Sequence, residues 1–382
     1  MRMLFLLSSV AIEIFFAMQR ISEMRLRLNS ISGKTKLPDK KVVSLVSTIL
    51  SPFLVPWKRR LETLAVMGFI FMWVILPIMD LWVPFHVLFN TRWWFLVPLY
   101  AVWFYYDFDT PKKASRRWNW ARRHVFWKYF ANYFPLRLIK TAELPPDRNY
   151  IIGSHPHGMF SVGGFTAMST NATGFEDKFP GIKSHIMTLN GQFYFPFRRE
   201  FGIVLGGIEV SKESLEYTLT KCGKGRACAI VVGGATEALD AHPNKNVLTI
   251  KNRRGFCRYA LKYGADLVPM YNFGENDLYE QYENPKGSRL RAVQERIKDI
   301  FGLCPPLLRG RSIFNQYIIG LLPFRKPVTT VIGKPIRVTQ TDEPTNEQVD
   351  ELHAKYCEAL YDLFEEYKHL HSIPPDTHLI FQ

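Results

Sequence analysis

Two long stretches without charge, both in the first third of the chain, restrict its fold most strongly. Residues Leu64–Met79 contain no charged side chain, and neither do Trp93–Tyr106. A helix needs about 20 apolar residues to cross the hydrocarbon core of a bilayer. The first stretch reaches that length if Asp80 lies near the far interface, and the second needs its flanking residues as well. The density of Trp, Phe and Tyr disfavours buried helices of a soluble protein. Two crossings and one re-entrant hairpin both fit, so we predict a membrane helical hairpin over residues 58–110.

Basic residues around these stretches predict the orientation of the hairpin. Arg92 is the only lysine or arginine between the two stretches. Basic residues gather on both outer flanks (Lys58, Arg59, Arg60, Lys112, Lys113, Arg116, Arg117, Arg122, Arg123). Under the positive-inside rule, both ends of the hairpin face the cytosol. The net charge of +15 also suggests an anionic partner. Because the basic residues flank apolar stretches, that partner is expected to be a membrane and not nucleic acid.

Residues 1–57 are expected to form a cytosolic or interfacial segment. Met3–Met18 is apolar with Glu13 inside it, which favours a helix lying at the membrane surface. A signal peptide is the alternative, but no convincing small-x-small cleavage site follows. Gln19–Lys41 is polar and basic, as in a flexible cytosolic segment. The five cysteines of the chain are scattered without a CxxC pair, which favours a reducing compartment and no disulfide framework.

From residue 111 onwards the pattern becomes that of an α/β domain. We expect five strands (Tyr150–Gly153, Gly202–Leu205, Ala227–Val232, Asp266–Tyr271, Val328–Ile332). We expect helices over Lys212–Lys221 capped by Ser211, over Arg253–Tyr263 capped by Asn252 and closed by Gly264, and over Glu347–Leu370. The last helix follows a capping-box pattern at Thr345 to Gln348 and carries an apolar stripe that includes Tyr356. Such alternation predicts a mainly parallel or mixed sheet covered by helices over residues 111–382.

The first candidate site directly follows the apolar run Tyr150–Ile152. Gly153 and Ser154 end the run, and the next residues read His155, Pro156, His157, Gly158. Open α/β sheets keep their chemistry at the carboxyl ends of strands, and histidine is the side chain best suited to move protons near neutral pH. A turn with two hydrogen-bonded histidines is the simpler interpretation. A metal site is disfavoured because no Asp or Cys cluster with ligand spacing accompanies the pair.

A second candidate site lies in Cys228–Leu239, which reads as a buried strand, a two-glycine turn and the start of a helix. Gly233 and Gly234 allow close approach of the backbone and leave amides free for an oxyanion. Glu237 is suited to orienting a histidine or an acceptor hydroxyl. An ordinary strand-to-helix turn with an acid in its first helical turn would have the same sequence.

A third candidate site is the basic helix that begins near Arg253. Arg254, Arg258 and Lys262 recur every four residues and therefore share one helical face. A basic stripe beside a helix N-terminus suits phosphate groups, through charge and through unpaired amides. A solvated face is the more common explanation for such a stripe, but the neighbouring Lys251 and Arg253 strengthen the binding interpretation.

Several of these segments together resemble the diacylglycerol acyltransferase type 2 family, which includes monoacylglycerol and wax-alcohol acyltransferases. The resemblance runs from about residue 56 to the C-terminus and rests on motifs in the family's order (Tyr133–Pro135, His155–Gly158, Gly233–Glu237, Arg254–Phe256 through Gly264 to Pro269, Gly274–Asn276). Ala114 and Ser115 stand where the family pattern has two glycines. Distant glycerolipid acyltransferases use His-x4-Asp, but Phe160 and Val162 occupy the corresponding positions here.

The resemblance implies a glycerolipid-acyltransferase-like catalytic domain behind the hairpin, in the endoplasmic reticulum membrane or on lipid droplets. The implied reaction moves a fatty acyl group from acyl-coenzyme A, a co-substrate and not a cofactor, to a lipid hydroxyl. Diacylglycerol is our first choice of acceptor, and monoacylglycerol or a wax alcohol is the next. A non-catalytic lipid-binding or droplet-tethering protein is the alternative from another class. The oligomeric state, including a homo-oligomer, is left open.

The implied site residues fall into two groups. His155 or His157 is the general base, with His155 favoured, and Glu237 orients the base or the acceptor. Acyl-coenzyme A is expected to contact the glycine turns and the basic helix (Pro156, Gly158, Gly233, Gly234, Arg253, Arg254, Gly255, Arg258, Lys262). No covalent acyl-enzyme is expected, because no cysteine or serine has a recognisable nucleophile setting. No metal is expected.

Overall fold

The computed structural model describes residues 55–301, 306–313 and 319–382. Residues Val55–Gln382 form one compact unit. The surface helix predicted over Met3–Met18 and the flexible segment predicted over Gln19–Lys41 lie outside the described residues.

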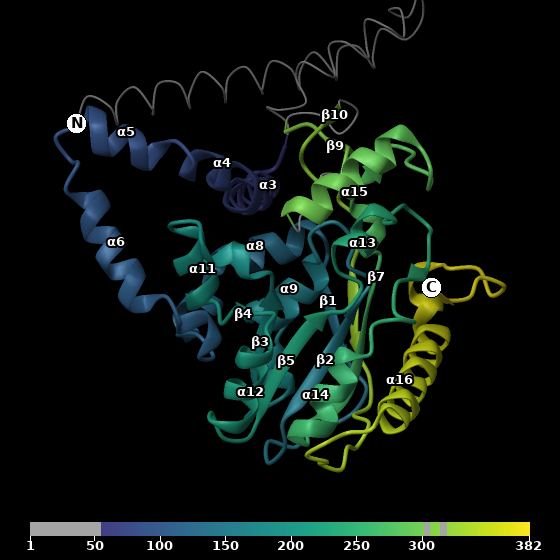
Figure 1. Ribbon diagram of the computed structural model, residues 1–382. Helices are drawn as coiled ribbons and strands as arrows, with labels where there is room; N and C mark the ends of the chain where they lie inside the picture. Colours follow the sequence, from purple (N-terminus) through teal and green to yellow (C-terminus); the bar gives the residue numbers. More distant parts are fainter. Residues whose placement is uncertain (1–54, 302–305, 314–318) are drawn as a thin grey trace, which may run out of the picture. The chain divides into compact units, whose positions relative to one another are not determined.

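The apolar region begins with three helical segments in direct succession, α3 (Trp57–Ile70), η1 (Phe71–Ile75) and α4 (Leu76–Asp80). They are followed by α5 (Val83–Asn90) and α6 (Leu96–Asp107) (Figure 1). Within the described residues, Trp57–Asp80 is the one helix long and apolar enough to cross a membrane, by length and composition alone. Its first half packs on α8 (Val125–Tyr133), and an ion pair of 2.6 Å joins Glu62 to Arg325.

The domain is built around a seven-stranded sheet with the order β1-β11-β7-β2-β5-β3-β4. The strands are β1 (Arg137–Lys140), β11 (Thr329–Ile332), β7 (Asp266–Phe273), β2 (Tyr150–His155), β5 (Arg226–Val231), β3 (Lys183–Thr188) and β4 (Ile208–Glu209). β11 is antiparallel to β7 and parallel to β1, and the other pairs in the sheet are parallel. The sheet is therefore mixed, as predicted. Every residue of β2 and β7 is buried, as expected for central strands covered on both faces.

Helices cover both faces of this sheet (Figure 1). Alternate strand residues face opposite sides, so Ile151 joins one core and Ile152 the other. The core around Ile151 includes residues of α12 (Lys212–Thr220), α14 (Gly255–Tyr263) and α16 (Asn346–Tyr367). The core around Ile152 includes residues of α9 (Val162–Ser169) and α10 (Phe175–Lys178).

The remaining elements are short, apart from α15 (Arg289–Phe301). Two small sheets pair β8 (Glu280–Gln281) and β10 (Ile319–Gly320) with β9 (Leu308–Arg311), and β6 (Val247–Leu248) with β12 (Ile380–Phe381). The other helices are α7 (Asn119–Arg122), α11 (Arg198–Val204), α13 (Gly234–Leu239), and the 3₁₀ turns η2 (Thr110–Lys112), η3 (Asn190–Phe193), η4 (Glu275–Leu278) and η5 (Lys368–His371).

Two sequence predictions about local structure are wrong. The strand predicted over Gly202–Leu205 lies in and just after helix α11, because a short apolar run fits a buried helix as well as a strand. Helix α14 begins at Gly255 and not at Arg253, and its N-cap is Arg254, without a side-chain hydrogen bond, and not the predicted Asn252. The cap at Ser211, the left-handed Gly264 and the capping box at Thr345 are confirmed.

Ala114 and Ser115, where the family pattern has glycines, both adopt positive φ, at 61° and 58°. This region of backbone space is the one that glycine occupies without steric cost. Positive φ therefore explains why glycine suits these two positions. In this chain, Ala114 and Ser115 adopt the same backbone conformation.

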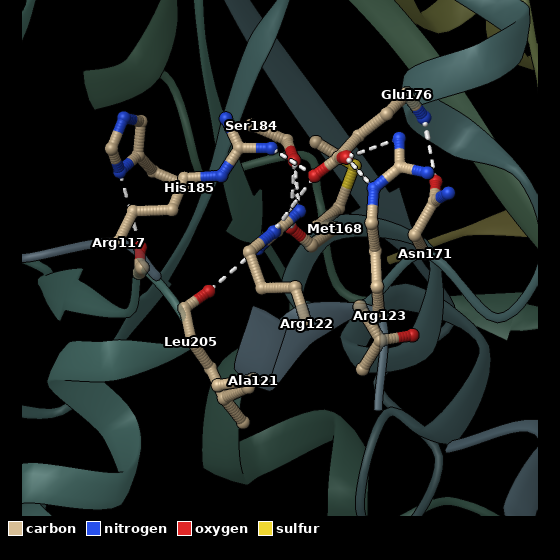
Figure 2. A network of polar contacts seen from close by, with 12 residues as sticks. Arg117, Ala121, Arg122, Arg123, Met168, Asn171, Glu176, Ser184, His185 and Leu205 are labelled. Carbon is tan, nitrogen blue, oxygen red and sulfur yellow. Dashed lines mark hydrogen bonds and ion pairs between the residues drawn. The ribbon is translucent and has the colours of Figure 1, made fainter. Parts of the chain in front are cut away.

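A buried arginine network joins α7 to the sheet (Figure 2). The Arg122 side chain is fully buried and donates to Glu176 Oε1 at 3.1 Å, to the carbonyl oxygens of Leu205 and Met168, and to Ser184 Oγ. Arg117 and Arg123 also pair with Glu176. Burial raises the pKa of this carboxyl, but the arginines outweigh burial and hold its pKa below the ordinary value. The network uses every polar group of Arg122 and fixes α7 against α10, α11 and β3.

Candidate active site

The predicted histidine turn lies at the carboxyl end of β2, the strand between β5 and β7. β2 ends at His155, and the peptide bond from His155 to Pro156 is cis. Gly158 has φ of +55°, and a Cβ there would overlap the Glu275 side chain. Glycine is therefore required at this position by both conformation and space.

The His155 imidazole is fully buried and has one partner among the described residues. Its Nε2 lies 3.1 Å from the Tyr356 hydroxyl, which itself donates to the carbonyl oxygen of Gly153 at 3.1 Å. Because the hydroxyl hydrogen is used in that way, Nε2 carries the imidazole hydrogen and Nδ1 keeps its lone pair. Nδ1 is buried without a hydrogen-bond partner in the described part of the chain. Burial lowers the pKa of His155 to about 3, so the ring is neutral at physiological pH.

Tyr356 is a site residue that the sequence did not reveal, because its spacing placed it in the apolar stripe of a helix. The ring of Tyr356 does pack in the core, 4.9 Å from Phe256 between ring centroids. Its hydroxyl approaches β2 so closely that a Cβ on Gly153 would overlap it. A buried tyrosine hydroxyl needs a polar partner. This requirement was the one feature of the sequence that could have identified Tyr356 as a site residue.

His157 is only half-buried, and its ring hydrogen is directed at the backbone. Nδ1 lies 3.0 Å from the carbonyl oxygen of Gly158, which indicates that Nδ1 donates and that Nε2 is the free nitrogen. Burial lowers the pKa of His157. Both histidines are therefore neutral near pH 7, as a general base must be.

Glu237, predicted to orient the base or the acceptor, contacts the histidine turn through the backbone and not through an imidazole ring. Its Oε1 accepts from the His157 amide at 2.5 Å, and its Oε2 accepts from the Thr249 amide at 2.8 Å. Burial raises the pKa of Glu237 to about 7, against the lowering effect of the two amides and of the Arg253 charge. A Cβ on Gly233 would overlap the Glu237 carboxylate. Gly233 therefore makes room for the acid that holds the turn, while Gly234 begins α13 at φ of +61°.

A second buried carboxylate, Glu275, holds the other side of the same turn. Its two oxygens accept from the amides of Val162 at 2.6 Å and Gly163 at 2.8 Å, at the start of α9. Burial raises the pKa of Glu275 to about 7, against the lowering effect of these amides. In the sequence, Glu275 was identified only as part of the family motif Gly274–Asn276, and no role was predicted for it. Asn272 completes the support by donating to the carbonyl oxygen of His155 at 3.0 Å.

The predicted basic helix, α14, begins beside the site and points away from it. Phe256 in its first turn packs on Tyr356. Arg254 pairs with Asp350 at 2.6 Å, and Arg258 donates to Asn346 Oδ1 at 2.6 Å and to the carbonyl oxygen of Pro344 at 2.8 Å. Both arginines are thus engaged by the start of α16.

The other residues predicted to bind phosphate make fewer contacts with the rest of the protein than Arg254 and Arg258 do. Arg253 is exposed and has no ion-pair partner within the described residues, and its charge acts on Glu237. A Cβ on Gly255 would meet nothing within 4 Å, so the helix start is open. Lys262 lies in the last turn of α14, far from the histidines along the helix.

A pocket of about 230 Å³ adjoins the histidine turn. Its lining mixes polar and apolar groups and includes Pro156, Asn272, Glu275, Asp277 and His371. In the described part of the chain, no group of three or more His, Cys, Asp or Glu side chains could hold a metal ion. The arrangement places the buried, unpaired Nδ1 of His155 at a backbone turn held by two carboxylates, which suits proton abstraction.

Comparison with known proteins places these residues in a family context. A family model described as diacylglycerol acyltransferase matches residues 86–382. The chain is 45% identical over 333 residues to 2-acylglycerol O-acyltransferase 1 of Bos taurus, covering 87% of this chain and 98% of that protein. It is 40% identical over 338 residues to diacylglycerol O-acyltransferase 2 of Homo sapiens, covering 87% of each chain. A solved 1-acyl-sn-glycerophosphate (LPA) acyltransferase from Thermotoga maritima aligns with 80% of this chain and 97% of its own, at 13% identity and a TM-score of 0.36.

Proposed function

The chain belongs to the diacylglycerol acyltransferase family, and on that premise we propose that it transfers a fatty acyl group from acyl-coenzyme A to diacylglycerol, which makes triacylglycerol. The observation that carries this proposal is the buried, unpaired Nδ1 of His155. Native structures pair most buried polar atoms, and an exception calls for an explanation. An acceptor hydroxyl at this nitrogen would supply the missing partner.

The reaction follows from that geometry. Nδ1 of His155 accepts the hydroxyl proton while the acceptor oxygen bonds to the thioester carbonyl carbon. The tetrahedral intermediate then expels the coenzyme A sulfur, which takes the proton from the imidazolium. Burial keeps the free ring neutral, and the negative charge that develops on the substrate stabilises the imidazolium when it forms.

The two carboxylates restrict which amides can stabilise the oxyanion. The amides of His157, Thr249, Val162 and Gly163 already donate to Glu237 or Glu275. The candidates that remain are the amides near Gly158 and those of Gly233 and Gly234. Glu237 and Glu275 then act as positioning residues, which fix the turn between them.

We assign the coenzyme A phosphates to the open start of α14. Arg253 and the region around Gly255 lie on the same side as Tyr356, close to the histidine turn. The ion pair of Arg254 with Asp350 is half exposed on both sides, and exposed pairs contribute only about 0–1 kcal/mol. A phosphate can therefore replace Asp350 at little cost. Lys262 is about 10 Å further along the helix, where only an extended ligand would reach it.

The lengths of the apolar helices support our proposal for the location of the protein. α5 has 8 residues and α6 has 12, which span about 12 and 18 Å, whereas the hydrocarbon core is about 30 Å thick. Trp57–Asp80 is long enough to cross, but its first half packs on α8 of the domain. We therefore choose the re-entrant hairpin, in which α5 and α6 enter one leaflet of the endoplasmic reticulum membrane and return. Both termini and the catalytic domain then face the cytosol, and lipid droplets, which have a single leaflet, are a compatible second location.

A 2-acylglycerol acceptor is the second candidate, favoured by the 45% identity to the Bos taurus enzyme named above. Membranes that contain the protein should be given labelled acyl-coenzyme A and a panel of diacylglycerol, 2-monoacylglycerol and a wax alcohol. We expect label in triacylglycerol. Label only in diacylglycerol made from monoacylglycerol would favour the second candidate. Absence of transfer to every acceptor would leave the lipid-binding alternative.

A further inference from the structure

Unpaired polar atoms also gather away from the histidine turn, between the apolar helices and α11. Trp73 Nε1, Asp80 Oδ2, Arg198 Nε and Glu200 Oε2 are all buried without a hydrogen-bond partner within the described residues. The first two belong to the helical stretch Trp57–Asp80, and the last two belong to α11. A concentration of unpaired buried atoms at one place indicates a missing polar partner.

Contacts between these residues bring the atoms into one neighbourhood. The Arg198 guanidinium carbon lies 4.5 Å from the centre of the Trp73 ring. The charges of Arg198 and Asp80 interact. Tyr100 of α6 donates its hydroxyl hydrogen to Glu200 Oε1 at 2.9 Å, which leaves Oε2 of the same carboxylate unpaired. The helical stretch Trp57–Asp80 and helix α6 therefore both contribute to the cluster.

No structural ion pair accounts for the burial of Arg198 within the described residues. Its side chain is only 8% exposed, yet no carboxylate among the described residues lies within ion-pair distance of it. Its neighbour Arg199 shows the contrast, because it pairs with Asp107 at 2.5 Å and thereby fixes α11 to the end of α6. The structural ion pair is made by Arg199, which leaves the donors of Arg198 for another partner.

An aromatic path leads from this cluster to the histidine turn. The Trp73 ring lies 6.0 Å from the ring of Phe165 in α9. Phe69, one turn before Trp73, lies 5.3 Å from Phe165 and 6.2 Å from Phe160. Phe160 is two residues after Gly158. Contacting aromatic rings thus connect the cluster to the residues that follow the histidine turn.

We propose that Trp73, Asp80, Arg198 and Glu200 bind the hydroxyl and ester groups of the acceptor glycerolipid where it leaves the bilayer for the catalytic turn. The inference rests on the proposed function, which supplies the acceptor. Trp73 and Arg198 offer hydrogen-bond donors that suit ester carbonyl oxygens, and the two carboxylates offer acceptors that suit a hydroxyl. A diacylglycerol presents both kinds of group on an otherwise apolar molecule. A bilayer phospholipid shares the ester chemistry, so the experiment must separate the two sources.

The test uses the full chain in membranes and two conservative variants. Arg198→Gln removes the charge, and Trp73→Phe keeps the ring but removes its N–H. We expect Arg198→Gln to raise the apparent KM for diacylglycerol on the order of tenfold, and Trp73→Phe about threefold, as losses of a charged and a neutral hydrogen bond. The KM for acyl-coenzyme A should not change in either. Arg92→Gln is the matched control, because Arg92 also lies over a tryptophan, Trp93, at 5.2 Å.

Photocrosslinking separates this inference from the proposed function. A photoreactive diacylglycerol should label the wild-type protein and the Arg92→Gln variant, and should label Arg198→Gln weakly. An unchanged KM for diacylglycerol in Arg198→Gln would overturn the inference, as would labelling by a photoreactive phosphatidylcholine in place of diacylglycerol. If Arg198→Gln does not accumulate, Trp73→Phe decides by the same criteria. Failure of the wild-type protein to acylate diacylglycerol would instead refute the proposed function.

Discussion

The hydroxyl of Tyr356 offers a sharp test, because it contacts the proposed base without contacting the expected substrates. Tyr356→Phe removes one oxygen atom and keeps the ring that packs on Phe256. The variant loses the hydrogen bond from His155 Nε2 and the one to the carbonyl oxygen of Gly153, each 3.1 Å long. The core packing should survive, while the imidazole loses the partner that fixes its tautomer.

The expected magnitude follows from the buried groups left behind. An unsatisfied buried N–H costs about 1–3 kcal/mol, which now opposes the tautomer that leaves Nδ1 basic. A change of about 1.4 kcal/mol corresponds to a tenfold change in population. We therefore expect kcat to fall by about 10- to 100-fold, with the KM values for both substrates little changed. The free energy of unfolding should fall by about 1–2 kcal/mol.

Initial rates with labelled acyl-coenzyme A and diacylglycerol measure this effect. Tyr361→Phe is the matched control, because Tyr361 is on the same helix and its hydroxyl lies 3.3 Å from His378 in an exposed pair. The control should keep the wild-type kcat. A folded Tyr356→Phe protein with the wild-type kcat would show that His155 needs no help from Tyr356 and would refute this reasoning.

The remaining predictions concern pH, the co-substrate and topology. Each oxygen of Glu237 and Glu275 accepts an amide hydrogen, so the ionised forms are required, and kcat should rise with pH through about 7 as two protons leave. Glu237→Gln or Glu275→Gln should leave a one-proton rise. An unaltered two-proton rise in both variants would contradict the assignment. The sign for stability is opposite, because a pKa raised above the ordinary 4.5 stabilises the fold below pH 4.5 and this stabilisation is lost as the pH rises through 7. Arg253→Gln should raise the KM for acyl-coenzyme A by about 10-fold or more without affecting the KM for diacylglycerol. Equal effects on both KM values would show that Arg253 is a solvated surface residue without a role in binding coenzyme A. Protease added to intact microsomes should digest tags at both ends of the chain, and protection of either tag would disprove the cytosolic topology.

Much of the fold was predictable because the central strands are buried on both faces. Such strands read as continuous apolar runs, and the predictions at Tyr150, Ala227 and Asp266 match β2, β5 and β7 closely. Gly202–Leu205 shows the limit of this signal, because a short apolar run does not distinguish a strand from a helix.

The approach of Glu237 to the histidine turn was predictable for a topological reason. β2 and β5 are parallel neighbours, so the residues that follow them meet at the same edge of the sheet. Tyr356 and Glu275 were not predictable in the same way. Tyr356 reaches His155 across 201 residues of chain, and Glu275 reaches Val162 across 113. Contacts of this kind depend on tertiary packing, for which the local sequence carries no periodic signal.

In the proposed reaction, His155 removes the proton from the acceptor hydroxyl. A direct measurement compares His155→Ala, His157→Ala and the wild-type protein in a single turnover, with labelled acyl-coenzyme A bound before diacylglycerol is added. Loss of a general base costs a factor of about 100 to 10,000. We expect a loss of that size in His155→Ala with acyl-coenzyme A binding intact, and a smaller loss in His157→Ala. Near-wild-type transfer by His155→Ala at normal protein levels would contradict the proposed reaction.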